Sequence, residues 1–209
     1  MNLLIIVLFV VILIIYLIYN NKLSNIKKPC SDDLTDKEYL SHMIPHHQVA
    51  IDISIILQKK SNNPIMQDIL RKIIWVQNYE IALMKDILTE LPDNISLIKD
   101  NKAYISTVSD FTIPNTLELT KTYCDPNFFD PEKHMKHMKN MELTDKMYIH
   151  HMIPHHQVAV DMSKILLKNT KNDTMINLAY RIIRSQQEEI ALLDDLQQNY
   201  YNHNSNMLV

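Results

Sequence analysis

The sequence predicts an all-α fold: a four-helix bundle made of two αα-hairpin repeats, preceded by an N-terminal transmembrane helix. Three observations support this prediction. Residues 42–50 and 151–159 both read HMIPHHQVA, at an offset of 109 positions (151 − 42). Each copy lies in a stretch whose apolar residues recur at helical spacing. The chain contains 0 glycines, which disfavours the tight turns of a β-rich fold and favours helices.

The two copies differ in how much of each has been kept. Between residues 34–54 and 143–163, 16 of the 21 positions are identical. The next stretches, 55–90 and 164–199, share far fewer residues. The segment that has been kept is the one rich in histidine and methionine, which indicates that a soft metal has held it unchanged.

The chain begins with an unbroken apolar run from Leu3 to Tyr19. At about 1.5 Å per helical residue, such a run comes close to the roughly 30 Å of a bilayer core. A cleavable signal peptide is the alternative, but no basic side chain precedes the run and no small-residue cleavage site follows it. We therefore expect residues 1–20 to form a single-pass membrane anchor, followed by a juxtamembrane linker over 21–33.

The side of the membrane is predicted from the flanking charges. Lys22, Lys27 and Lys28 follow the apolar run and nothing basic precedes it, which favours a cytoplasmic or particle-interior domain. The two cysteines, Cys30 and Cys124, are not equivalent in the repeats. We expect them to pair if the domain faces an oxidising space and to be free if it faces the cytosol.

The first hairpin is predicted over 34–92. Its first helix starts at Thr35 or Asp36, both suitable caps, and runs to about Lys60. Pro45 lies inside this pattern, so the helix is expected to kink or restart there. The alternative is a short helix ending at Met43, with a second one starting at the proline. A loop over 61–64 follows, and then a helix over 64–91.

The second hairpin is predicted over 143–201, with helices over 144–167 and 174–200 and a polar tail over 202–209. Residues 93–142 link the hairpins. They contain three prolines among scattered polar residues, so mostly irregular structure is expected. The linker ends in the His/Met-rich run HMKHM at 134–138.

Histidine and methionine at a spacing of four can share one metal ion when the intervening turn is helical. Imidazole suits several transition metals, whereas thioether favours Cu(I), so a mixed His/Met set without cysteine indicates copper before zinc. The alternative is that these side chains are ordinary core residues. The candidate metal ligands are His42, Met43, His46, His47, His134, Met135, His137, Met138, His151, Met152, His155 and His156.

Two polar pairs are also kept between the copies, Gln77 with Glu80 and Gln186 with Glu189. Each pair lies on the inner face of the second helix of its hairpin. A carboxylate at this place can accept the free N–H of a metal-ligating histidine. The alternative is a structural bond that ties the two helices together.

Several function classes are excluded by the residues. A net charge of −3 gives no footprint for nucleic acid. The Glu-x-x-His pairs of carboxylate-bridged di-iron bundles are absent, as are His-Glu-x-x-His, phosphate-binding glycine loops and the Gly-x-Ser-x-Gly elbow. These absences favour a non-catalytic protein, and a metalloenzyme with an open coordination site is kept as an alternative.

The segments HMIPHHQVAIDIS and HMIPHHQVAVDMS, each followed by a Q-x-x-E-I helix, resemble the domain of unknown function 305 (DUF305) family. The resemblance covers about 34–90 and 143–199. It implies a ferritin-like helical bundle, and for some members copper binding through His and Met in bacterial envelopes. It also implies an exported domain, against the charge flank.

The function predicted from the sequence is a membrane-anchored, copper-binding bundle that sequesters or buffers the metal. The alternatives are a structural membrane or envelope protein without metal, and the metalloenzyme. The predicted partners are the membrane and a metal ion. The sequence identifies no protein partner.

Overall fold

The computed structural model describes residues 8–17, 27–91, 123–138 and 142–202, and these residues are all helix, turn or coil. The longest elements are four α-helices, α2 (Asp36–Gln58), α3 (Pro64–Glu90), α5 (Asp145–Asn169) and α6 (Asp173–Leu196). Shorter elements are the 3-10 helix η1 (Pro126–Phe129), the helix α4 (Pro131–Met138) and a π-helical end, η2 (Gln197–Asn202). The all-α prediction is confirmed for this part of the chain.

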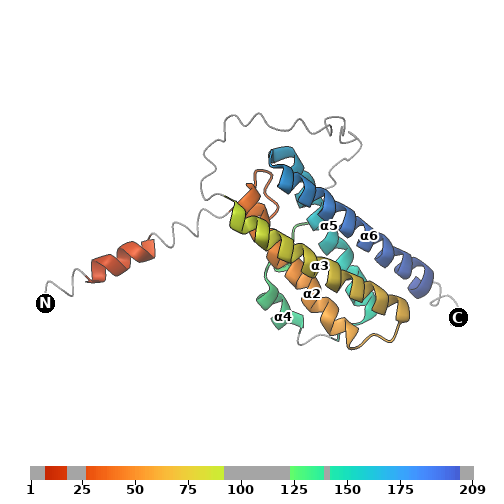
Figure 1. The fold of residues 1–209 in the computed structure, drawn as a ribbon. Helices are drawn as coiled ribbons and strands as arrows, with labels where there is room; N and C mark the ends of the chain where they lie inside the picture. Colours follow the sequence, from red (N-terminus) through yellow and green to blue (C-terminus); the bar gives the residue numbers. More distant parts are fainter. Residues whose placement is uncertain (1–7, 18–26, 92–122, 139–141, 203–209) are drawn as a thin grey trace.

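The long helices pack as two hairpins against each other. Helix α2 packs on α3 and α5 packs on α6, and the hairpins meet where α2 contacts α5 and α3 contacts α6 (Figure 1). The short helix α4 lies against α2, outside the four long helices. The result is a helical bundle with one additional helix on its surface.

Caps at equivalent positions define where the long helices start. Thr35 and Glu38 form a capping box at α2, and the Thr144 side chain accepts a hydrogen bond from Met147 N at α5. Asn63 and Asn172 cap α3 and α6 in the same way. The local signals that predicted the helix starts are therefore used in both copies.

Helix α2 continues through Pro45, and α5 continues through the equivalent Pro154. The alternative of two separate helices is therefore wrong. A proline removes one backbone hydrogen bond and clashes with the preceding turn, which costs about 3 kcal/mol in an isolated helix. In both hairpins the packing on either side of the proline outweighs this cost.

The core consists of two apolar clusters, and equivalent residues of the two repeats lie in different clusters. Tyr39 and Met43 belong to one cluster, whereas their equivalents Tyr148 and Met152 belong to the other. Met66 and Met175 are exchanged in the same way. A twofold relation between the hairpins produces this exchange, and it places residues near the middle of α2 opposite their own equivalents in α5.

One prediction about the connecting segments needs correction. The described part of the linker is not mostly irregular, because η1 and α4 occupy most of residues 123–138. Asp125 and Asp130 each accept a backbone hydrogen bond at a helix start, and each is followed by proline at the first helical position. The rest of the linker, 92–122 and 139–141, lies outside the described residues.

The cysteines left open by the sequence are joined. Cys30 and Cys124 form a disulfide across 94 residues of sequence, and Cys30 adopts a positive φ of 65°. The bond ties the segment before α2 to the segment before η1. Disulfides of this kind persist in oxidising compartments.

The predicted single-pass membrane anchor, and with it the membrane localisation, is wrong. No helix in the described part of the chain is long and apolar enough to cross a membrane. Within the apolar run, residues 8–17 are helical. The other residues of the predicted anchor, and residues 21–26 of the linker, lie outside the described residues.

Candidate metal centre

Four histidines meet in the middle of the bundle. His46 and His47 come from α2, and His155 and His156 come from the equivalent turn of α5. All four side chains are 0% exposed. They lie between the two apolar clusters because the twofold exchange of the hairpins brings the copied segments together.

His46 and His155 form the closest contact between the two copies. Their rings stack with centroids 3.8 Å apart and planes inclined by 10°. His46 Nε2 also lies 3.2 Å from the backbone carbonyl oxygen of His155, close enough for the ring N–H to donate to it. Phe128 and Phe129 of η1 cover the stack, at 4.8 Å from the His155 ring and 4.9 Å from the His46 ring.

The other two histidines face carboxylates within their own hairpins. His47 Nε2 lies 2.8 Å from Glu80 Oε2, in hydrogen-bond contact, and His156 Nε2 lies 3.0 Å from Glu189 Oε2. The second contact is within the distance of an ion pair. It is not a hydrogen bond, since His156 Nε2 has no hydrogen-bond partner. The carboxylates that the sequence singled out therefore lie beside histidines in both hairpins.

Each carboxylate is also held by the opposite hairpin. Ser185 Oγ donates to Glu80 Oε1 at 2.7 Å. Gln77 Nε2 and Gln186 Nε2 both donate to Glu189 Oε2 at 3.2 Å. The two environments differ, because Glu80 receives a hydroxyl donor and Glu189 receives two amide donors.

Burial favours the neutral form of the two stacked histidines. It lowers the pKa of His46 and of His155 well below 6.5, and the neighbouring histidines lower both further. The pKa of His151 falls to about 4, mainly through burial and then through His134. Neutral imidazole is the form that binds metal.

The donor set of this centre fits a soft transition-metal ion. Three methionines, Met43, Met84 and Met152, are fully buried in the clusters around the histidines. A buried ring nitrogen without a hydrogen bond costs about 1–3 kcal/mol, which a metal–nitrogen bond would remove. The ring nitrogens without a hydrogen-bond partner are His46 Nδ1, His47 Nδ1 and both nitrogens of His155 and His156.

The present side-chain arrangement does not form a finished site. Within the described residues, no three His, Cys, Asp or Glu side chains are grouped so as to hold one metal ion. The stack explains this, because parallel rings present their nitrogens side by side and not toward one point. Metal binding here requires at least one ring of the stack to turn.

The remaining predicted ligands lie outside this group of four, although the His151 ring is only 6.0 Å from the His155 ring. His42 Nε2 lies 2.9 Å from the backbone oxygen of Lys27. His134 and His151 face each other with ring centroids 5.0 Å apart. Met135 and Met138 are half-buried on α4, and the side chain of His137 lies outside the described residues. The structure thus divides the predicted ligands between the bundle interior and its surface.

Sequence reasoning missed the residues that lock and cover the centre. Tyr39 Oη pairs with Ser163 Oγ, and Tyr148 Oη pairs with Ser54 Oγ, each at 2.7 Å across the two hairpins. These four residues are identical between the copies, and that identity was the signal that could have found them. The covering phenylalanines of η1 occur once, so the repeat gave no signal for them.

The fold is similar to that of proteins of known structure. The structure is similar to that of CopM in its Cu(I)-bound form, with 29% identity, a TM-score of 0.56 and coverage of 81% of this chain and 99% of that chain. The Cu(II)-bound form of CopM gives 28% identity with the same TM-score and coverage. A DUF305 fragment from Deinococcus radiodurans, at 18% identity with a TM-score of 0.52, covers 77% of this chain and 93% of its own and shares the fold.

A sequence relative is Uncharacterized protein L153 of Acanthamoeba polyphaga mimivirus, which is 43% identical over 54 residues. That match spans 26% of this chain and about a third of the relative's length (36%). The model of the domain of unknown function (DUF305) matches residues 20–94 and 127–207, which include all four long helices. The chain therefore belongs to the DUF305 family, with one match in each half.

Proposed function

We propose that this protein binds copper through its central histidines and the methionines beside them, and that it stores or buffers the metal without catalysis. One observation carries the proposal. Four histidines, all fully buried, leave ring nitrogens without hydrogen bonds, and the buried Met43 and Met152 precede His47 and His156 by four residues on the same helices. A core built only for stability gains nothing from such nitrogens, whereas a soft cation would satisfy them.

The similarity to CopM supports the choice of metal. CopM has been solved in Cu(I)-bound, Cu(II)-bound and Ag-bound forms. Silver and Cu(I) share a preference for thioether and imidazole. The buried methionines of this chain supply the first and its histidines supply the second. The two hairpins, over 34–92 and 143–201, would then act as the halves of one ferritin-like four-helix bundle.

The equivalent methionines Met43 and Met152 belong to the proposed ligand set, and Met84 distinguishes the two halves because its equivalent is Leu193. His47 and His156 would be oriented by Glu80 and Glu189, as metal-binding histidines commonly are. The difference between Met84 and Leu193 predicts that the two hairpins bind copper with different affinities.

A structural bundle without metal is the second candidate, and the stacked His46–His155 pair favours it. Stacked neutral rings under two phenylalanines pack well as a core. The two candidates differ in what they predict for soft-metal binding by the untagged protein.

The test is an anaerobic Cu(I) titration against a competing chelator, with Zn(II) in parallel. The double variant Met43→Leu/Met152→Leu keeps side-chain volume and is expected to fold. It should weaken Cu(I) binding and leave the melting temperature nearly unchanged. The matched control is Met66→Leu/Met175→Leu, which changes two equivalent, fully buried methionines at the starts of α3 and α6, 14 residues before Glu80 and Glu189.

Replacing both His46 and His47 should remove tight copper binding at the first copy. Replacing both His155 and His156 should do the same at the second copy. If the parent binds Cu(I) no better than the methionine double variant does, the centre is structural and the proposal fails. Loss of helicity in the histidine variants, with unchanged Cu(I) binding in the methionine variant, would also reject it.

A further inference from the structure

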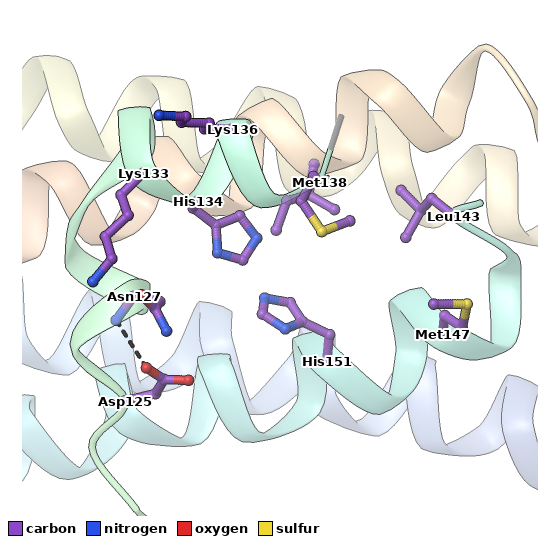
Figure 2. Close-up of a pocket in the computed structure, with 10 residues that line it drawn as sticks. Asp125, Asn127, Lys133, His134, Lys136, Met138, Leu143, Met147 and His151 are labelled. Atoms are coloured by element: carbon purple, nitrogen blue, oxygen red, sulfur yellow. Dashed lines mark hydrogen bonds between the residues drawn. The ribbon is translucent and has the colours of Figure 1, made fainter. Parts of the chain in front are cut away.

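A second group of metal-type side chains lies in an open cleft on the surface of the bundle. The cleft has a volume of about 910 Å³ and lies between α4 and the first turns of α5 (Figure 2). His134 and Met138 of α4 line one side, and Met147 and His151 of α5 line the other. None of these four residues belongs to the central histidine group.

The two rings across the cleft are close enough to share an ion. The His134 and His151 ring centroids are 5.0 Å apart, with planes inclined by 41°. An ion at about 2.0–2.1 Å from one nitrogen of each ring requires centroids within about 6 Å of each other. His151 Nε2 is buried and has no hydrogen-bond partner. The tilted rings, unlike the central stack, can point a nitrogen each toward a common position.

A thioether is available from the same helix. Met138 follows His134 by four residues, so both side chains leave α4 on one face. Figure 2 shows the Met138 sulfur beside the gap between the two rings, and Lys133 and Lys136 also line the cleft. Two imidazoles and a thioether form a donor set that suits Cu(I) and Ag(I) and is poor for hard cations.

The repeat shows that this arrangement belongs to one half only. The equivalent of His151 is His42, and its Nε2 contacts the backbone oxygen of Lys27 at 2.9 Å. In the first half, the segment before α2 thus lies beside His42. At the equivalent place in the second half, His151 lines the cleft. Helix α4 has no counterpart before α2 among the described residues, so the second half alone supplies a facing histidine.

We infer that His134, Met138 and His151 form a second binding site for a soft monovalent cation at the cleft. This site adjoins the central histidines, because the His151 and His155 rings lie 6.0 Å apart. The site deepens the proposed function, on which it rests for the identity of the ion.

The test uses Ag(I), which is redox-stable, and the full chain. Native mass spectrometry gives the stoichiometry, and NMR of the histidine rings shows which residues respond. Ag(I) should shift the ring resonances of His134 and His151 together. The variants His134→Ala and His151→Ala should each bind one ion fewer than the parent does. Met138→Leu should lower the affinity for that ion by about tenfold or more, since even the loss of a residue that only supports a metal ligand costs about that much affinity.

The matched control is His150→Ala, which removes an exposed histidine next to His151 that does not line the cleft. It should keep the parent stoichiometry. If His150→Ala loses the ion equally, or if the rings of His134 and His151 do not shift, Ag(I) binds surface histidines at random and the inference is wrong. Met138→Leu conserves volume, so it decides the matter even if an alanine variant unfolds.

Failure of this site and failure of the central one give different results. Loss of an ion in His134→Ala, with no change in Met43→Leu/Met152→Leu, would support the cleft and reject the central copper site. Unchanged stoichiometry in both His134→Ala and His151→Ala would reject the cleft, whatever the methionine variant does.

Discussion

The rings of His46 and His155, which are 109 residues apart in sequence and equivalent in the repeat, stack at 3.8 Å with their planes inclined by 10°. Both side chains are 0% exposed. Such a contact between equivalent residues places the twofold relation of the two hairpins at this stack. Because two protonated rings would repel each other at this distance, the folded state requires both to be neutral.

This stack predicts a loss of stability in mild acid. Burial holds the pKa of His46 and His155 well below 6.5 in the folded protein, whereas each returns to about 6.5 on unfolding. As pH falls below about 6.5, these histidines bind protons in the unfolded chain but not in the native state. The free energy of unfolding should then decrease by up to about 1.4 kcal/mol per pH unit for each such histidine.

Urea unfolding of the metal-free protein at pH 7.5, 6.5, 5.5 and 5.0 measures this effect. His151, whose pKa is lowered to about 4, should add to the slope across the same range. An unfolding free energy that is flat between pH 6.5 and 5 would show that the central rings are not held neutral.

The cross-hairpin tyrosines give a second prediction. Ser163 Oγ donates to the Ala159 carbonyl at 2.7 Å, so the Tyr39 hydroxyl must be the donor to Ser163. Tyr39→Phe should therefore cost about 1–2 kcal/mol, because it leaves a buried hydroxyl without its donor. Tyr148→Phe should cost the same, since Ser54 Oγ donates to Ala50 in the equivalent way.

Chemical denaturation of the two tyrosine variants checks this, with Tyr79→Phe as the control. Tyr79 is 51% exposed, and phenylalanine retains a ring for its contact with Arg181. Equal losses for Tyr39→Phe and Tyr148→Phe are expected. A loss in only one of them would show that the two hairpins are not locked in equivalent ways.

The helices were largely predictable from the sequence because their signals are local. Thr35, Asn63, Thr144 and Asn172 are cap residues followed by apolar periodicity, and the structure starts a helix after each. The placement of Glu80 and Glu189 beside histidines was also predictable, because a spacing kept in both copies implies a contact kept in both hairpins.

What the sequence did not reveal depends on distant parts of the chain. Nothing local to Cys30 or Cys124 indicates their pairing, because they are not equivalent in the repeats. The stacking of His46 on His155 depends on how closely two hairpins approach, which periodicity does not measure. The membrane anchor was predicted from hydropathy alone, and no helix among the described residues is long and apolar enough to cross a membrane.

The disulfide gives a third prediction. It closes 94 residues of sequence and joins the segments that precede α2 and η1. Cys30→Ser/Cys124→Ser should lower the free energy of unfolding by about 2–4 kcal/mol, because the unfolded chain regains the entropy of an open loop. Thermal unfolding of the parent with and without a reductant should reproduce the difference.

The same variant should loosen η1 and α4, which follow Cys124 and cover the histidines. Amide hydrogen exchange in residues 126–138 should accelerate more than in α3, which the disulfide does not touch. Equal stability of the reduced and oxidised parent would show that packing alone holds this segment.

The last prediction concerns the two carboxylates beside the histidines. Glu80 contacts His47 at 2.8 Å and is held by the Ser185 hydroxyl, whereas Glu189 contacts His156 and receives two amide donors. Charged acceptors raise the basicity of a ligating imidazole, and losing one typically lowers metal affinity about 10–100-fold.

Glu80→Gln should therefore weaken Cu(I) binding by about tenfold or more while the bundle stays folded, as chelator competition and circular dichroism would measure. Because glutamine can accept only one of the two hydrogen bonds that Glu80 accepts, the variant removes the charge and one contact, and the melting temperature is measured beside the affinity. Glu188→Gln is the control, since that carboxylate pairs with Lys72 at the surface. Unchanged Cu(I) affinity in Glu80→Gln, with a lower melting temperature, would assign Glu80 to holding the hairpins together and not to the metal.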